Sequence, residues 1–184
     1  MQKLIITVLA KDKPGIIAQI SHILFQCDCN LENVNQMILQ NQFAGFFLVQ
    51  PPEGLTRTDL KQTLEEKTKD AGLTIHITHV EENGSTAPET GTDIFLVTTS
   101  GPDQKGLVAK ISAIIAGHQA NILNLKAVFK GGQSPESNVM SYQVLITEEV
   151  DSQALFAELR AKAEELNLDI RIQHRNIFDA INKI

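Results

Sequence analysis

Hydrophobic and polar positions in the first half of this chain follow a strand period and a helix period in alternation. A short apolar run rich in β-branched residues, over residues 4–9, is typical of a buried strand. After a turn at residues 11–15, apolar side chains recur at the spacing of one helix face. That face consists of Ile16, Ile17, Ile20, Ile23 and Leu24. The remaining predicted elements are strands over residues 31–39, 46–49 and 75–78 and a helix over residues 58–70.

The same pattern returns in the second half. Asp12 recurs as Asp103 and Gly15 as Gly106, an offset of 91 residues. The five apolar helix positions are there Leu107, Val108, Ile111, Ile114 and Ile115. The elements that follow are predicted as strands over residues 122–129, 142–146 and 170–173 and a helix over residues 152–166. A repeat this long predicts two copies of one domain, because the units of solenoid proteins are shorter, at about 20–50 residues.

Both copies therefore have the element order β-α-β-β-α-β. We predict an α+β protein with two ferredoxin-like βαββαβ domains in tandem, in which the helices cover one face of an antiparallel four-stranded sheet. The second and third strands of each copy should pair as a hairpin. The domains are predicted over residues 1–80 and 93–175, joined by a linker over residues 81–92 that is rich in Gly, Ser, Thr and Pro.

Each predicted sheet keeps one face that its own helices leave uncovered. Small domains bury limited surface, so we expect a neighbouring sheet or a second chain to cover that face. The tail over residues 176–184 adds a helical stripe that needs a docking surface. Its members are Ile177, Phe178, Ile181 and Ile184. These features predict a homodimer.

Polar residues mark both ends of the second helix in each copy. Thr58-Asp59 and Asp151-Ser152 offer oxygens that can accept hydrogen bonds from the first backbone N–H groups. Gly72 and Asn167 can take the left-handed conformation that ends a helix.

Composition narrows the partners. The net charge of −6 and the pI of about 5.3 argue against nucleic-acid phosphates, and 5% aromatic residues argue against base stacking. No apolar run reaches the length of a membrane span, and a strand that begins at residue 4 leaves no room for a signal peptide. Cys27 and Cys29, the two cysteines of the chain, do not have zinc spacing. We therefore expect a cytoplasmic protein with free thiols.

Candidate chemistry lies at the repeated turn between the first strand and the first helix. A helix N-terminus exposes backbone N–H groups that can hold a carboxylate. Asp12 or Asp103 could accept hydrogen bonds from an ammonium group, and Asn30 or Asn121 offers both a donor and an acceptor. The alternative is that the aspartates only cap their helices and the glycines only turn the chain.

An Asp-x-x-Gly turn that opens the first helix, with Asn just after that helix, resembles the ACT domain, and the likeness covers nearly all of both copies. The resemblance implies regulation of amino-acid metabolism through amino acids bound at domain interfaces, with glycine or serine as ligand. The implied ligand-binding residues are Asp12, Lys13, Pro14, Gly15, Ile16, Asn30, Asp103, Lys105, Gly106, Leu107 and Asn121. Because Lys105 stands where the first copy has Pro14, whether one copy or both bind stays open.

Three classes of function remain: a ligand sensor, a small enzyme and a purely structural interaction protein. An acylphosphatase-like enzyme would need an arginine near the first turn, but the first arginine is Arg57. His76 and His79 would face opposite sides of a strand and could not share a metal ion. We therefore expect no catalytic residues, no metal and no cofactor. The resemblance to tandem ACT proteins, a group that includes a regulator of the glycine cleavage system, implies contact with a transcription regulator or, alternatively, with an amino-acid metabolic enzyme.

Overall fold

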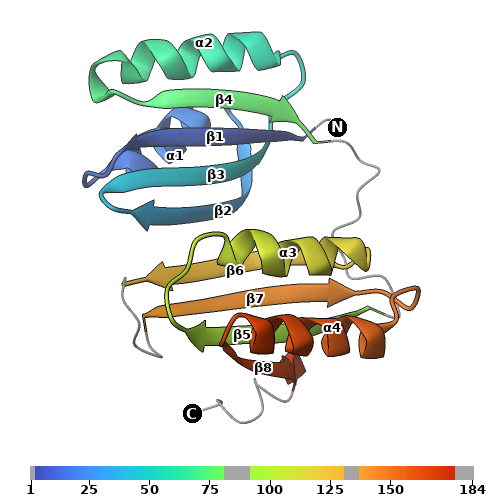
Figure 1. The fold of residues 1–184 in the computed structure, drawn as a ribbon. Coiled ribbons are helices and arrows are strands. Elements are labelled where there is room, and N and C mark those ends of the chain that lie inside the picture. Colours follow the sequence, from blue (N-terminus) through green and yellow to red (C-terminus); the bar gives the residue numbers. More distant parts are fainter. Residues whose placement is uncertain (1–2, 81–91, 131–136, 177–184) are drawn as a thin grey trace. The chain divides into compact units, whose positions relative to one another are not determined.

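The computed structural model describes residues 3–80, 92–130 and 137–176. The chain divides into two compact units, residues 1–85 and 86–184, and each is considered by itself (Figure 1). The division falls within the segment predicted as a linker. Apart from Thr92 and Asn176, the predicted linker and tail lie outside the described residues.

Each unit has the predicted order of elements. In the first they are β1 (Leu4–Lys11), α1 (Ile16–Gln26), β2 (Asn30–Leu39), β3 (Gln42–Gln50), α2 (Arg57–Thr68), a 3-10 turn η1 (Lys69–Ala71) and β4 (Thr74–His79). In the second they are β5 (Asp93–Gly101), α3 (Leu107–Gly117), β6 (Asn121–Phe129), β7 (Asn138–Ile146), α4 (Ser152–Glu165) and β8 (Asp169–His174). The prediction of two βαββαβ domains is confirmed.

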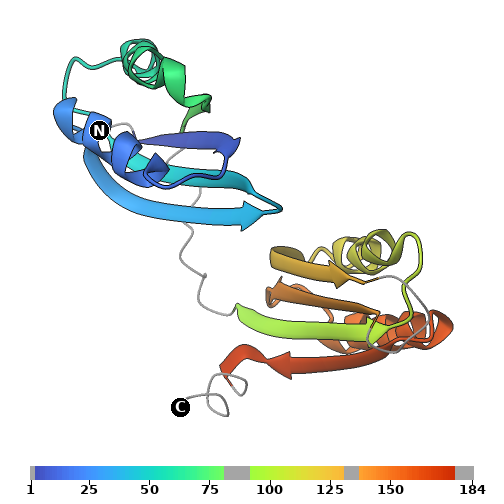
Figure 2. The same cartoon turned by 90° about the vertical axis from the view of Figure 1, so that its left-hand side faces the viewer.

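The two sheets have the same topology. Their strand orders are β2-β3-β1-β4 and β6-β7-β5-β8, and every pair is antiparallel. The predicted hairpins are therefore β2–β3 and β6–β7. Within the first domain α1 lies on one face of the sheet, and within the second domain α3 and α4 lie together on one face (Figure 1). In both views β2 is an outer edge of its sheet (Figures 1 and 2).

Alternation along the strands decides which side chains enter each core. Leu4, Ile6 and Val8 of β1 are buried beneath the helices, and the residues between them face the other side of the sheet. The helices add buried residues at helical spacing, namely Ile16, Ile20, Ile23, Leu24, Leu60 and Leu64. The second core repeats this arrangement around Val97, Ile111, Ile115, Tyr142, Leu155 and Leu159.

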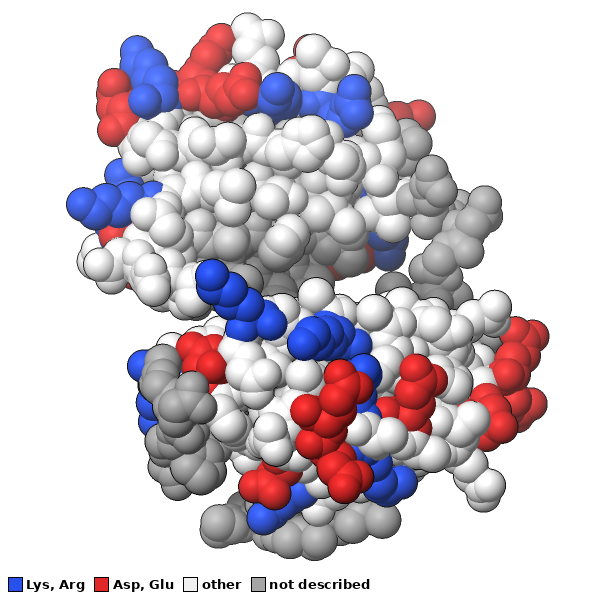
Figure 3. Space-filling model, viewed as in Figure 1, with Lys and Arg blue, Asp and Glu red and all other residues white. Residues whose placement is uncertain are grey.

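The face of the first sheet opposite its helices is uncovered by the domain itself, as predicted. Leu9, Met37, Leu39 and Phe46 are exposed there, at 49%, 56%, 66% and 47%. Figure 3 shows this side of the first domain as a largely uncharged surface, with charged residues gathered over α2. Exposed apolar side chains gathered on one face indicate an interaction surface.

The ends of the second helices correct one prediction and confirm three. Asp151 caps α4, since its carboxylate accepts from the backbone N–H of Ala154 at 3.0 Å. Gly72 and Asn167 are left-handed, with φ of 66° and 54°. The cap of α2 is Thr56 and not the predicted Thr58-Asp59. Thr56 Oγ1 accepts from Asp59 N at 3.1 Å and donates to Asp59 Oδ2 at 2.7 Å, so the helix starts earlier than predicted.

Candidate functional site

The repeated turns have the same backbone geometry in both domains. Gly15 and Gly106 are the N-cap residues of α1 and α3, with left-handed φ of 96° and 82°. A Cβ built on either glycine would meet no other atom within 4 Å. Glycine is therefore required by the backbone conformation, and the space outside the turn is open. This supports the turning role of the glycines that the sequence left as an alternative.

No side chain caps α1 or α3. The alternative that Asp12 and Asp103 cap these helices is therefore wrong. The first backbone N–H groups of each helix remain available, and they carry partial positive charge. Three residues before each cap glycine stands a carboxylate, exposed in Asp12 and half-buried in Asp103. Each turn thus combines hydrogen-bond donors with a nearby anion, a pair that complements a zwitterion.

A side-chain bond ties each turn to the end of the second helix of its domain. Lys13 Nζ donates to the carbonyl oxygen of Ala71 at 2.7 Å, and Gln104 Nε2 donates to that of Leu166 at 2.7 Å. The two donors are equivalent in the repeat, so the tie is the same although the chemistry differs. Lys13, predicted to contact ligand, therefore has a structural bond. The offset of 91 residues makes Gln104 the counterpart of Lys13. Sequence analysis did not predict their shared structural role, because one side chain is an amide and the other an ammonium group.

Different groups support the two turns from the sheet. In the first domain, Asp12 N donates to the carbonyl oxygen of Asn41, in the β2–β3 turn, at 2.7 Å. In the second, Asn138 Nδ2 donates to the carbonyl oxygens of Gly101 and Pro102 at 3.0 and 2.9 Å. Asn138 is fully buried, and its Oδ1 has no hydrogen-bond partner in the described part of the chain. Sequence analysis missed it because Phe43 occupies the equivalent strand position in the first copy.

Asn30 and Asn121 lie far from the turns of their own domains. Asn30 pairs with Gln50 at the start of β2, whereas Asp12 bonds to Asn41 at the opposite end of that strand. A strand of this length spans about 30 Å. Asn121 likewise pairs with Leu145, far from Gly101 and Asn138. The structure therefore does not bring the two halves of the predicted site together within one domain.

The remaining predicted site residues stay at the turns. Pro14, Gly15, Lys105 and Gly106 are exposed, and Ile16 and Leu107 are buried where their helices start. Pro14 and Lys105 occupy equivalent positions, and the cap geometry is the same beside both.

Other candidate chemistry is accounted for by packing. Burial, with Cys27 and Asp28 as neighbours, raises the pKa of the Cys29 thiol to about 11, so it is not a thiolate at neutral pH. The pairing of β4 with β1 places His76 and His79 on opposite faces of the sheet, as predicted. Within residues 3–80, 92–130 and 137–176, no group of three His, Cys, Asp or Glu side chains could hold a metal ion.

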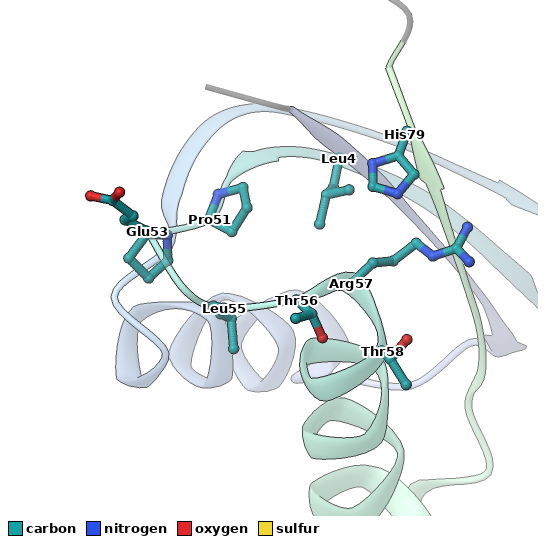
Figure 4. A pocket seen from close by; sticks show the side chains of 9 residues that line it. Leu4, Pro51, Glu53, Leu55, Thr56, Arg57, Thr58 and His79 are labelled. Carbon is teal, nitrogen blue, oxygen red and sulfur yellow. The ribbon is translucent and has the colours of Figure 1, made fainter.

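One pocket in the first domain contains none of the predicted site residues. Its volume is about 630 Å³, and it lies where the β3–α2 loop meets the start of β1 and the end of β4 (Figure 4). Its lining residues are Leu4, Pro51, Pro52, Glu53, Leu55, Thr56, Arg57, Thr58 and His79. Sequence analysis missed this pocket because its residues come from three separate segments.

Comparison with known proteins places the chain in a family. The family model for the ACT domain matches residues 2–78 and 93–173, once in each domain. The chain belongs to the ACT-domain family. It is a tandem ACT protein, and ACT domains are regulatory modules that typically bind small amino-acid ligands. No helix in the described ranges is both long and apolar enough to cross a membrane.

The chain also resembles shorter proteins that have the length of a single domain. A UPF0237 protein of Clostridium acetobutylicum is 40% identical over 76 residues, which cover 85% of that protein and 41% of this chain. The UPF0237 protein YjhC of Lactococcus lactis is 33% identical over 89 residues, 97% of that protein and 48% of this chain. This ACT protein therefore also belongs to the UPF0237 family.

Two solved structures illustrate the likeness over almost the whole chain. An unknown protein of Galdieria sulphuraria has a TM-score of 0.77 at 22% identity and covers 94% of this chain and 98% of its own. A proposed glycine cleavage system transcriptional repressor has a TM-score of 0.69 at 18% identity, with 94% and 96% covered. At these identities the likeness shows the fold.

Proposed function

We propose that this tandem ACT protein is a non-catalytic sensor of a free amino acid, with glycine or serine as ligand. The observation that carries the proposal is the pair of uncapped helix N-termini, each preceded by a carboxylate and each opened by a left-handed glycine. Glycine draws support from the solved structure named as a proposed glycine cleavage repressor, and serine from the resemblance to the ACT family alone.

The chemistry of each turn suits an amino acid. The ligand carboxylate accepts hydrogen bonds from the free N–H groups of α1 or α3, where the helix dipole favours negative charge. The ligand ammonium donates to Asp12 or Asp103. The space outside Gly15 and Gly106 is open, so a small ligand can approach the backbone.

The asparagines can contribute only from another copy of the domain. Asn30 and Asp12 lie about a strand length apart, about 30 Å, so no single amino acid can touch both within one domain. A ligand held by both groups takes the turn from one chain and the asparagine from a second copy. On this proposal, amino-acid binding and self-association strengthen each other.

Calorimetry on the full chain with each of the twenty amino acids tests the sensor. We expect glycine or serine to bind, and Asp12→Ala or Asp103→Ala to weaken binding at least tenfold, because each removes the partner of the ammonium. Glu149→Ala removes an equal charge from an exposed loop and should change nothing. No heat with any amino acid would overturn the sensor and leave the structural interaction module as the better account.

We infer that the signal leaves through protein contact, with a transcription regulator as partner. A net charge of −6 disfavours phosphate contacts, and the uncharged open face of the first sheet suits a protein surface. In a gel-shift assay the purified protein alone should not retard promoter DNA at physiological salt. Retardation that weakens steeply with added salt would show direct DNA binding and contradict this output.

A further inference from the structure

We propose that the pocket of the first domain is a second ligand site, for a small organic anion. Arg57 and His79 would hold the oxyanion, a carboxylate or a phosphate, and the apolar residues Leu4, Leu55 and Pro51 would hold the organic part. The proposal does not depend on the amino-acid site at the turns.

Size and lining both favour an organic ligand. A volume of about 630 Å³ is in the range of small-molecule sites and far exceeds what an inorganic ion needs. Leu4 is buried, and Leu55 and the two prolines are half-buried, so one side of the pocket is an apolar wall. Such a wall with a few convergent polar groups is the usual composition of a small-molecule site.

The polar groups at the pocket include two nitrogen-bearing side chains that can donate hydrogen bonds to an oxyanion. Arg57 comes from the start of α2 and His79 from the end of β4, and Figure 4 shows both side chains on the same side of the pocket. Neither has a hydrogen-bond or ion-pair partner within the described ranges. The carboxylate among the lining residues, Glu53, points away on the opposite side (Figure 4). A free guanidinium presents a planar set of donors that matches carboxylate and phosphate oxygens.

The backbone N–H groups at the N-terminus of α2 are not what recognises the ligand. Thr56 Oγ1 already accepts a hydrogen bond from the backbone of Asp59, so the helix caps itself. Thr58, unlike Thr56, does not cap the helix, and it lines the pocket. Recognition therefore rests on side chains from two separate elements.

The second domain provides an internal comparison in which the equivalent positions are occupied differently. Phe95 stands where the first domain has Leu4, and Ser152 where it has Arg57. His174, the counterpart of His79, has its Nε2 3.0 Å from Asp93 Oδ1. The imidazole that is free in the first domain thus has a carboxylate partner in the second.

Aromatic rings also pack at these positions in the second domain. The centroid of the Phe95 ring lies 5.1 Å from that of His174 and 4.9 Å from that of Phe156, both edge-on. Where the first domain has an unpaired arginine and a leucine, the second therefore has a serine hydroxyl and a cluster of aromatic rings. Of the two copies, the first domain therefore has the unpaired guanidinium and imidazole at these positions, and the second does not.

The pocket and the proposed amino-acid site lie at opposite ends of the same sheet. Leu4 begins β1, and the Asp12 turn follows Lys11 at its other end, a span of about 25 Å. A ligand in the pocket cannot contact the Asp12 turn of the same domain. The two sites can therefore be tested separately.

Amide NMR shifts of the full chain, titrated with phenylphosphate, benzoate and inorganic phosphate, test the proposal. We expect saturable shifts at Leu4, Leu55, Arg57 and His79 with phenylphosphate or benzoate, and the tighter of the two identifies the oxyanion. Arg57→Gln should weaken that binding at least tenfold. Arg160→Gln, which removes the same charge from an exposed position on α4, should leave it unchanged. Thr58→Glu should also block binding by offering Arg57 an internal carboxylate.

Three results would overturn the proposal. They are no saturable shift at the pocket with any probe, equal binding to Arg57→Gln and the unchanged chain, and inorganic phosphate bound as tightly as phenylphosphate. The last would mean that the apolar wall contributes nothing. Amino-acid binding to Arg57→Gln should remain unchanged, so failure of this site and failure of the sensor are distinguishable.

Discussion

At the scale of single residues, Gly101 is a position where the second domain has no room for a side chain. Gly101 ends β5 under the loop after α4. A Cβ on Gly101 would lie 2.6 Å from Leu168 Cδ2 and 2.9 Å from the carbonyl oxygen of Asn167. The equivalent residue of the first domain is Ala10, so the same place in the fold accepts a methyl group in one copy and excludes it in the other.

Gly101→Ala should therefore destabilise the second domain. Because a backbone carbonyl cannot move aside like the tip of a side chain, we expect a loss of about 1–3 kcal/mol. Denaturant unfolding followed through amide signals of the second domain measures it. Ala10→Gly, the reciprocal change, should cost about 0.5–1 kcal/mol through backbone entropy, together with the loss of one buried methyl group. A loss in Gly101→Ala no greater than in this control would contradict the close contact.

Buried thiol and phenol groups should make both domains sensitive to alkali. Burial raises the pKa of Cys29 from 9.0 to about 11 and that of Tyr142 from 10.0 to about 12. The unfolded chain then loses these protons at lower pH than the folded chain. The contribution of each group to the free energy of unfolding is complete below its pKa in the unfolded chain. It is lost as the pH rises through its pKa in the folded chain.

The pH windows differ between the domains, at about 9 to 11 for the first and about 10 to 12 for the second. Thermal unfolding at a series of alkaline pH values should show this order. Cys29→Ala, which copies Ala120 of the second domain, should remove the thiol contribution, and Tyr142→Phe the phenol contribution. An unchanged pH dependence in both variants would show that other groups are responsible.

At the scale of elements, hydrophobic period predicted nearly everything within one copy. Strands and helices have distinct periods, and the repeat supplied each prediction twice. The position of Asn30 relative to Asp12 could not be read in this way. The two are close in sequence, but α1 carries the chain back along the sheet, so they lie at opposite ends. Bonds such as that of Asn138 also escaped, because they join residues that no local pattern connects.

The start of α2 gives a test at this scale. Thr56 caps the helix through Asp59, whereas the predicted cap residue Thr58 lies inside it. Thr56→Ala should destabilise the first domain by about 1 kcal/mol, the usual value of a lost N-cap. Thr58→Ala is the matched control and should stay within about 0.5 kcal/mol, as surface substitutions do. Chemical denaturation compares them, and equal losses would refute the assignment of the cap.

At the scale of the whole molecule, the unpaired sheet edges suggest how chains assemble. β4 and β8 are short, whereas β2 and β6 are long and expose apolar side chains. On β2 these are Val34, Met37, Ile38 and Leu39, and on β6 they are Leu123, Leu125, Val128 and Phe129. A long apolar edge offers unpaired backbone groups to another strand. The sequence predicted an uncovered sheet face but not this edge. The pattern of a single strand does not show whether that strand lies at the edge or in the middle of its sheet.

We predict that the chain is a homodimer in which such an edge takes part. Sedimentation velocity at micromolar concentration should show a dimer, and Ile38→Lys on β2 should shift it toward monomer, because a charge would be buried at the contact. Thr78→Lys places the same charge on the β4 edge and should leave the dimer intact. A monomer without any substitution, or equal effects of the two lysines, would contradict this role of β2.

The same edge has a consequence during synthesis. The equivalent positions of the two domains are 91 residues apart, so at 5–20 residues per second the first domain leaves the ribosome roughly 5–20 s before the second. Throughout that interval the apolar β2 edge is presented to solvent by a half-made chain. Neighbouring ribosomes on one messenger RNA hold several such chains close together. Correct pairing and aggregation therefore compete before the chain is finished, and the rate of translation is one of the factors that decide between them.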